Sequence, residues 1–595
     1  MRSHFSAAAL AGAGLIALLL AATGCNKPAV RSQSPDEATQ LEEREAELVG
    51  DVALPVGLEP IVLEGVSLVT GLPGTGSDSP PSAYRSELMK EMQRRGIDEP
   101  NKILQSKETA LVLVRGYLRP GVAKGDTFDI EVRCVSDSET VSLRGGWLME
   151  TRLRQFAVLG GSLREGKVLA LAGGAIMIDP DAEIRGDKIN ATRGRVLGGG
   201  VSLESRPLGL RLKPGSQSVV VSSRVSNAIQ KRFHSYAETG LQKGAATAKT
   251  DEFIELDVHP RYKHNIPRYL QVVRMIPLQE TAEKRGVRMA SLEQKLLDPI
   301  SSARAALQLE AVGNEGAPLL RKGLTHESPE VQFYAAEALA YLGDKSSVDP
   351  LATLTEAQPA FRVFSLTALA TVDDVRAYER LRGLIDCPSA ETRYGAFRAL
   401  WVMDKQDPFV RGELLNGRFH YHVLDSVGPP MVHATRSFQP EIVVFGREQR
   451  FRSPLLLKAG PRITVVSRGG DRITVARLAT GEPAEERETS LRVDDVLRAV
   501  AELGGSYPDV VQLLQEAKSQ KVMEGRFEID ALPEAGRTFE RAAPSEGWDD
   551  QVAAANPGAD EFDEDEDEET PKKKPGFFGR MNPFKKSEKT EASDE

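Results

Sequence analysis

The sequence predicts an α+β fold in which a β-rich body, encoded in two separate stretches, is interrupted by an α-solenoid and followed by a disordered tail. Three observations support this prediction. Short apolar runs separated by Gly, Pro and Asp fill residues 58–278, as is typical of strands. A leucine then recurs at a nearly constant interval through residues 302–403. Strand-like runs return after Arg418.

The N-terminus has the features of a secretory signal, predicted to cover residues 1–25. Arg2 and His4 precede the apolar run at 7–22, "AAALAGAGLIALLLAA", which suits a signal-peptide core better than a membrane span. The run ends in Ala22-Thr23-Gly24-Cys25, which resembles a bacterial lipobox. Cys25 is therefore predicted to carry the lipid. An ordinary signal peptide with an incidental cysteine is the alternative.

The residues after the cysteine point to the outer membrane. Asn26 stands where an aspartate retains many lipoproteins at the inner membrane. Residues 26–50 are polar and charged, so we expect a tether between the lipid and the folded body.

Composition limits the class of protein. The chain of 595 residues allows two to four domains, and its net charge of −10 argues against nonspecific nucleic-acid binding. If Cys25 carries a lipid, only Cys134 and Cys387 remain. They lie far apart in the sequence, so we expect neither a disulfide framework nor a CxxC metal site.

Residues 51–290 are expected to form the first half of the body. Strand-like runs there include "ALVLVRGYL", "TFDIEVRCV", "VLALAGGAIMI" and "FIELDVHP". Two helices are predicted among them, at Tyr84–Arg95 and Ser222–Tyr236. In the second, Val225, Ala228, Ile229 and Phe233 share one face.

The segment "TGLPGTGSD", residues 70–78, raises the question of phosphate binding. A P-loop requires Lys-Ser/Thr directly after its last glycine, but Ser77 and Asp78 follow Gly76 here. Pro80-Pro81 then opposes the helix start that a dinucleotide site needs. The glycines Gly71, Gly74 and Gly76 are therefore interpreted as turn positions.

Residues 296–410 are predicted to be the solenoid. Leu309, Leu339, Leu369 and Leu400 recur at steps of 30, 30 and 31 residues, and Leu320, Leu351 and Leu381 occupy a second helix of each unit. Such a period indicates stacked helix pairs resembling short HEAT repeats. An ordinary bundle of alanine-rich helices is the alternative.

Residues 411–535 are expected to form the second half of the body. Its strand-like runs precede two helices, "RVDDVLRAVAELGG" and "YPDVVQLLQEAKSQ". Residues 536–595 are predicted to be a disordered tail, because like charges repel within the acidic run at 560–569 and the hydrophobicity of the tail is low.

The β-rich parts resemble the flagellar basal-body P-ring protein family. The first half carries, in the family's order, "LVTGLPGTGSD", "SLRGGWLMETRL", "KVLALAGGAIMI" and "GGGVSLESRPLGLRLKPGSQSVVVSSRVSNAIQKRF". The second half carries "EIVVFGREQRFRSPLLLKAGPRITV" and "RVDDVLRAVAELGGSYPDVVQLLQEAKSQKVMEGRFEI". The resemblance covers about residues 58–278 and 439–529, so the solenoid is an insertion into a P-ring-like body.

This resemblance implies a periplasmic homo-oligomeric ring around the flagellar rod, acting as a bushing beneath the L-ring, with no catalysis and no cofactor. Its partners would be further copies of the chain and the rod and L-ring proteins. The glycine loops, with Arg144, Gly145 and Gly146, would then shape the fold or subunit contacts. Arg144 is expected either to pair with a carboxylate of a neighbouring subunit or to be a solvated surface arginine.

Two other functions were weighed against the ring. His420, His422 and His433 could hold a divalent ion, but no carboxylate follows at helical metal spacing and no nucleophile motif is apparent, so neither a metal nor enzyme activity is predicted. The second alternative is a non-flagellar envelope lipoprotein whose repeats bind a protein partner, because this chain has its own lipobox, inserted repeats and acidic tail. The prediction is a lipid-anchored ring protein of the basal body, located in the periplasm at the outer membrane.

Overall fold

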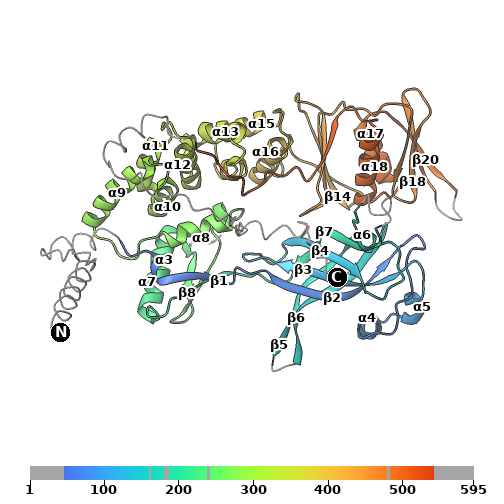
Figure 1. Cartoon of the computed structure of the whole chain (residues 1–595), viewed down its shortest axis with the longest axis horizontal. Coiled ribbons are helices and arrows are strands. Elements are labelled where there is room, and N and C mark those ends of the chain that lie inside the picture. Colours follow the sequence, from blue (N-terminus) through green and yellow to red (C-terminus); the bar gives the residue numbers. More distant parts are fainter. Residues whose placement is uncertain (1–45, 160–161, 180–186, 237–241, 479–482, 542–595) are drawn as a thin grey trace, which may run out of the picture.

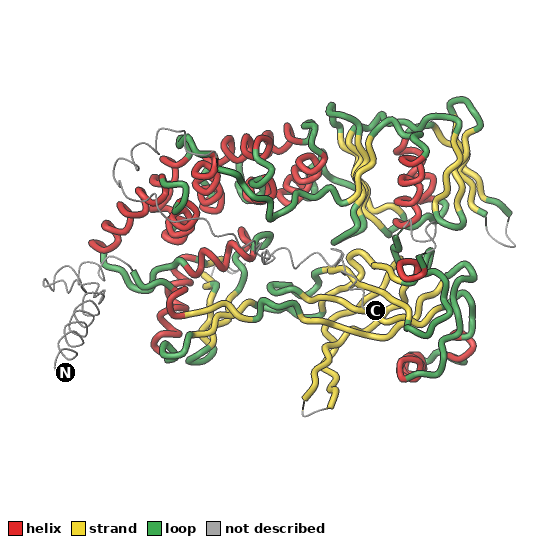
Figure 2. Tube along the Cα trace, viewed as in Figure 1, coloured by secondary structure: helices red, strands yellow, loops and turns green. Residues whose placement is uncertain are grey.

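The computed structural model describes residues 46–159, 162–179, 187–236, 242–478 and 483–541. The described chain forms two layers (Figures 1 and 2). One layer holds a barrel and a small sheet domain, both from the first half of the body. The second layer holds the helical array above the small domain and the second half of the body above the barrel. The predicted β-rich body, interrupted by a helical array, is confirmed. The signal peptide, Cys25 and the tail at 542–595 lie outside the described residues.

Six antiparallel strands close the barrel in the order β2-β3-β4-β7-β6-β5. Apolar side chains alternate along them, so that Val112, Val114, Ile130 and Val132 fill the interior. Two helices, α4 (Ala83–Arg94) and α5 (Pro100–Leu104), cover part of the outside. The barrel strands are β2 (Ile61–Thr70), β3 (Ala110–Leu118), β4 (Thr127–Cys134), β5 (Trp147–Leu159), β6 (Ser162–Ala175) and β7 (Arg193–Ser202), with the short α6 (Lys188–Ala191) before β7.

The small domain contains a four-stranded antiparallel sheet and packs against the array. Its strand order is β1 (Ala53–Val56), β8 (Leu208–Leu212), β12 (Phe253–Leu256) and β11 (Ala246–Ala248). Its helices are α3 (Val49–Val52), α7 (Val219–Arg232) and α8 (Ile266–Arg274). A hairpin of β9 (His234–Tyr236) and β10 (Gln242–Gly244) follows α7.

The structure corrects two expected boundaries in this domain. The helix predicted to reach Tyr236 ends at Arg232, because Phe233 turns to extended backbone and buries its ring against Tyr262 and Tyr269. Residues 47–50, expected in the tether, lie in the body. There the backbone N–H of Val49 donates to Ile276, and Val49 is fully buried.

The helical array runs from α9 to α16 as helix pairs. Leu309, Leu320, Leu339, Leu351, Leu369, Leu381 and Leu400, the residues that predicted the repeat, are all buried. Helix α9 crosses the expected boundary between 290 and 296, because its Leu292 and Leu296 pack with the first repeat rather than with the body. The helices are α9 (Ala282–Leu297), α10 (Ser302–Val312), α11 (Ala317–Gly323), α12 (Pro329–Leu342), α13 (Val348–Ala357), α14 (Arg362–Leu369), α15 (Val375–Leu384) and α16 (Ala390–Met403).

The second half of the body places two helices between two sheets (Figure 1). One sheet has the order β13 (Glu413–Leu415), β14 (Phe419–Leu424), β16 (Glu441–Phe445), β15 (Met431–Ala434) and β21 (Arg526–Ile529). The other contains β17 (Leu455–Ala459), β18 (Ile463–Ser467), β19 (Arg472–Arg477) and β20 (Glu485–Ser490). The helices are α17 (Val493–Glu502) and α18 (Tyr507–Ser519), whose apolar residues share one core with both sheets.

A buried ionic cluster joins the small domain to the array. Arg268 on α8 pairs with Glu310 on α10 and Glu337 on α12, and all three side chains are buried. The Tyr262 hydroxyl also donates to Glu310 at 2.6 Å. Burial alone would lower the pKa of the Arg268 guanidinium, but the two carboxylates outweigh it and raise that pKa. Both carboxylates therefore depend on one arginine for their neutralising charge.

Replacing Arg268 tests the importance of this cluster. Arg268→Ala should lower the free energy of unfolding by about 3–5 kcal/mol, because it leaves buried carboxylates without a cation. Urea denaturation followed by circular dichroism measures the change. The matched control is Arg380→Ala, whose partner Asp349 is 54% exposed, and its cost should stay below about 1 kcal/mol. Equal losses for the two variants would contradict the role given to Arg268.

Candidate functional site: the junction between the two halves of the body

Backbone N–H groups of the "TGLPGTGSD" loop hydrogen-bond to carbonyls of the segment before β3. The N–H of Leu72 donates to Glu108 and that of Gly76 to Lys107, at 3.0 and 2.8 Å. The Thr75 hydroxyl donates to the carbonyl of Ser142 at 2.8 Å. Two of the amides that a phosphate cradle would need are thus engaged with neighbouring carbonyls. The loop is a structural connection between β2 and α4.

Position 76 requires glycine because the fold leaves no room there for a side chain. A Cβ at this position would lie 2.1 Å from the carbonyl oxygen of Thr109, a backbone atom that cannot rotate away. Gly71 and Gly74 instead have positive φ angles, of 76° and 77°. The interpretation of this loop as a turn built on glycine therefore rests on close approach at one position and on backbone conformation at two.

The structure brings the second glycine cluster beside the first. The position of a Cβ on Gly146 is 2.5 Å from Val69 and 2.9 Å from Leu72, so Gly146 lies directly against the first loop. Gly145 faces Pro461 of the second half of the body, at 3.5 Å from the corresponding Cβ position. The second cluster thus lies between the first loop and the second half of the body.

Arg144 connects the two halves within one chain. Its Nη1 donates to Oε1 of Gln512 on α18 at 2.9 Å, across 368 residues of sequence. Its charge also lowers the pKa of the nearby Asp509, although burial dominates and leaves that pKa raised. Arg144 therefore makes one described hydrogen bond within its own chain. Whether it also pairs with a carboxylate of a neighbouring subunit is not tested by this contact. The role of these loops in assembly stays a prediction.

Sequence reasoning missed a second link between the halves. Asp129 on β4 accepts from the N–H of Gly198 and from the N–H of Phe438, both at 2.9 Å. The Arg119 guanidinium lies over the Phe438 ring, 5.1 Å from its centre. No local pattern in the sequence marks Asp129, because its partners lie 69 and 309 residues away.

The three histidines serve the packing of the second half. Nδ1 of His422 is 2.8 Å from the carbonyl of Val410, and Nε2 of His433 accepts from the N–H of Ala531 at 3.0 Å. His433 stacks on Tyr394, and its burial lowers its pKa to about 3. His420 lies half-buried beside His422, with ring centres 6.4 Å apart. Among the described residues, no group of three or more His, Cys, Asp or Glu is arranged to hold a metal ion.

Glu441 on β16 anchors the last repeat to this half. It is fully buried and accepts from the Tyr394 hydroxyl at 2.8 Å and from Arg398 at 3.1 Å, both on α16. Gln439 donates to it at 2.6 Å. The array is therefore tied to the body by buried carboxylates at both ends, Glu310 at one and Glu441 at the other.

Neither remaining cysteine forms a described disulfide. Cys134 is half-buried in the barrel wall, and burial raises the pKa of its thiol to about 11. Cys387 is half-buried just after α15.

In the described part of the chain, no helix is both long enough and apolar enough to cross a membrane.

The two kinds of glycine position predict different costs for alanine. Gly76→Ala should lower the free energy of unfolding by about 3 kcal/mol or more, because the new Cβ overlaps a backbone carbonyl. Gly74→Ala is the matched control, because nothing lies within 4 Å of its Cβ position. Its free energy of unfolding should fall by only about 1–2 kcal/mol, the cost of an alanine in the left-handed backbone conformation. Thermal unfolding of both variants measures the difference. A Gly76→Ala protein as stable as Gly74→Ala would contradict the close approach.

Comparison with known proteins finds similarity to two families in separate parts of the chain. The sequence profile of the flagellar P-ring protein matches residues 49–289, and that of HEAT repeats matches residues 317–401. A flagellar P-ring protein of Wolinella succinogenes is 29% identical over 184 residues, 31% of this chain and 50% of the relative. Those of Thermotoga maritima and Anaeromyxobacter dehalogenans are each 27% identical, over 40% and 44% of this chain and 69% and 70% of the relatives.

The chain thus spans about half to 70% of the length of these curated relatives. The P-ring profile covers the barrel and the small domain, and the HEAT profile covers α11 to α16. The resemblance of the first half of the body to the P-ring family and that of the array to HEAT repeats are confirmed. The resemblance of residues 439–529 to the P-ring family stays a prediction. The chain therefore contains a part similar to the flagellar P-ring proteins, followed by HEAT repeats.

Proposed function

We propose that this protein is a structural subunit of a P-ring-like ring in the periplasm, anchored by a lipid on Cys25 and acting as a bushing around the flagellar rod. The observation that carries the proposal is the match of residues 49–289 to the P-ring family. The relatives are named for a flagellar ring, and the family is not an enzyme family. The partners proposed are further copies of the chain and the rod and L-ring proteins, with no nucleic acid among them.

The contacts between the two halves support this proposal. Ring assembly needs a body of fixed shape, because small angular errors accumulate around a closed ring. Arg144 and Asp129 each bridge from the barrel to the second half, although the array intervenes in the sequence. An inserted segment adds little closure entropy, because that cost grows only logarithmically with the length of the loop. The array is therefore compatible with ring formation by the body.

A second candidate function is that of an envelope scaffold outside the flagellum, which binds a protein partner through the HEAT repeats. One observation favours it specifically. The array already holds an extended segment of its own chain, Arg537–Arg541, through side-chain contacts. Self-association distinguishes the two functions, because a ring subunit forms closed oligomers by itself and a scaffold awaits its partner.

Electron microscopy tests the ring. With a tag at the C-terminal end, purified protein in detergent should form closed rings. Gold label in basal-body preparations should encircle the rod. The untagged chain, carried through the same labelling, controls for nonspecific gold. Labelled particles that lack a rod, together with monomers in detergent, would contradict the ring proposal and favour the envelope scaffold.

Substitution of Cys25 tests the anchor. Cys25→Ser should move the protein from the membrane fraction to the soluble periplasmic fraction, with at least a tenfold drop in labelled palmitate incorporated, because the sulfur that accepts the lipid is gone. Cys387→Ser, which alters a cysteine of the array, is the matched control and should stay with the membrane. A Cys25→Ser protein that still incorporates palmitate would disprove the lipidation site.

A further inference from the structure

The described chain continues past the last strand and returns across the helical array. After β21, Leu532 and Phe539 pack against the core that the array shares with the body. Gly395 on α16 leaves room for Pro533, since a Cβ there would lie 2.9 Å from the proline ring. Residues 536–541, expected in the disordered tail, therefore lie on the repeats. We call residues 533–541 the C-terminal segment.

Two arginines of the C-terminal segment pair with carboxylates of the array. Arg537 donates to Glu391 at 2.6 Å. Arg541 donates to both oxygens of Glu330, at 2.7 and 3.0 Å. Such a two-pronged contact fixes the plane of a guanidinium as well as its position.

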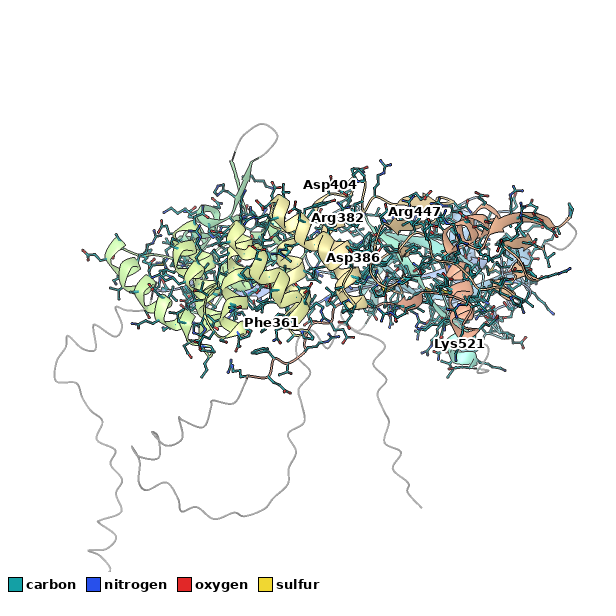
Figure 3. All side chains as sticks on the ribbon, turned by 90° about the horizontal axis from the view of Figure 1, so that it is seen from above. Phe361, Arg382, Asp386, Asp404, Arg447 and Lys521 are labelled. Atoms are coloured by element: carbon teal, nitrogen blue, oxygen red, sulfur yellow. The ribbon has the colours of Figure 1, made fainter. Side chains whose placement is uncertain are left out.

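An aromatic contact lies between these two ion pairs. The Phe539 ring is 4.9 Å from that of Phe361, which stacks on Phe333 at 4.3 Å with the planes nearly parallel. Figure 3 shows Phe361 at the edge of the helical array, beside the C-terminal segment. Phe361 is 5% exposed, and the Phe539 ring is one of the groups packed against it.

These contacts share one location in three successive repeats. Glu330 lies in the first turn of α12, Phe361 is the N-cap of α14, and Glu391 lies in the first turn of α16. The three positions are 31 and 30 residues apart, which is the repeat interval itself. The array therefore presents an acid, an aromatic ring and an acid in line along one edge. We call this row the edge site.

The bound segment has the periodicity of an extended peptide. Arg537, Phe539 and Arg541 contact the array, while Thr538 and Glu540 between them are exposed. Alternate residues of an extended chain point to opposite sides, so every second side chain can reach the row. The basic, aromatic and basic residues of the segment thus match the edge site in order and in charge.

We propose that the edge site is a peptide-binding site for extended segments of the pattern basic-x-aromatic-x-basic, and that the C-terminal segment occupies it in cis and blocks it. The partner is a polypeptide that presents this pattern and displaces the resident segment. The inference does not depend on the ring proposed above, because it concerns only the array and residues 533–541.

A direct test uses a fluorescein-labelled peptide with the sequence of Pro533–Arg541. The opened variant is the full chain with Arg537→Ala, Phe539→Ala and Arg541→Ala, which keeps its length but loses the side chains that fill the site. Fluorescence anisotropy should show that the opened variant binds the peptide at least tenfold more tightly than the unaltered chain. A peptide with alanine in place of Phe539 should bind at least tenfold more weakly.

Matched controls separate the edge site from nonspecific charge. Glu330→Gln with Glu391→Gln, added to the opened variant, should weaken peptide binding at least tenfold. Glu379→Gln, which removes an exposed carboxylate of α15 away from the row, should leave binding unchanged. Thermal unfolding of each variant confirms that the array is folded. Failure of the opened variant to bind better than the unaltered chain, or equal binding of both peptides, would overturn the proposal.

Sedimentation distinguishes the source of the resident segment. If it binds in cis, the unaltered and opened chains should show the same oligomeric state. Oligomers of the unaltered chain that the free peptide dissociates, and that the opened variant does not form, would overturn occupancy in cis and show exchange of the segment between copies.

Discussion

The position of the helical array depends on buried carboxylates that receive their hydrogen bonds from both sides of a domain junction. A stack of helix pairs has two ends whose apolar faces lack a neighbouring repeat. Here the small domain packs against α10 and α12 near the first end, and the sheet containing β14 and β16 packs against α16 at the other end. Glu310 and Glu441 are fully buried at these ends. Since a buried charge is tolerated only when it is paired and hydrogen-bonded, each carboxylate requires its neighbour in one orientation.

These constraints explain how the insertion leaves the body intact. The array leaves the small domain at α8 and returns to the body at α16, so it bridges two parts of one unit. Asp386, after α15, accepts from the Ser426 hydroxyl and from the N–H groups of Val427 and Gly428. Figure 3 shows Asp386 where the helices meet the β-rich half. In the opposite layer, Arg144 and Asp129 join the barrel to the same half, so both layers contact it.

Periodic features of this fold could be predicted from the sequence, and features set by distant partners could not. The leucine interval predicted the helix pairs because every repeat buries the same position. Strand alternation predicted β3 and β4, but not that six strands close a barrel, since closure depends on pairings far apart in the chain. Helix α9 was missed because it crosses the expected boundary between 290 and 296, and its Leu292 and Leu296 are identified as core residues only by their packing against the array.

The candidate site shows the same division. The need for glycine at position 76 followed from the local pattern, although its cause, the carbonyl of Thr109, is visible only in the fold. The partner of Arg144 is 368 residues away, and the histidines that suggested a metal ion instead make hydrogen bonds and ring contacts with the array and its flanking loops. Residue type alone does not distinguish a ligand from a buried packing group.

The ionic contacts of the array fall into two physical classes, and the difference bears on which of them can open. Arg268 is buried with both of its partners, so neither carboxylate would gain contact with solvent if the arginine were withdrawn. Glu391 is 26% exposed and also pairs with Arg362 at 3.0 Å, so it keeps a cation when Arg537 leaves. Glu330 lies in the first turn of α12, where the helix dipole favours a negative charge. Opening the edge site therefore leaves Glu391 paired with Arg362, and Glu330, 7% exposed with the segment in place, keeps the favourable helix dipole. Neither compensation exists for Glu310 and Glu337 if Arg268 is withdrawn, so the junction with the small domain is the costlier contact to open.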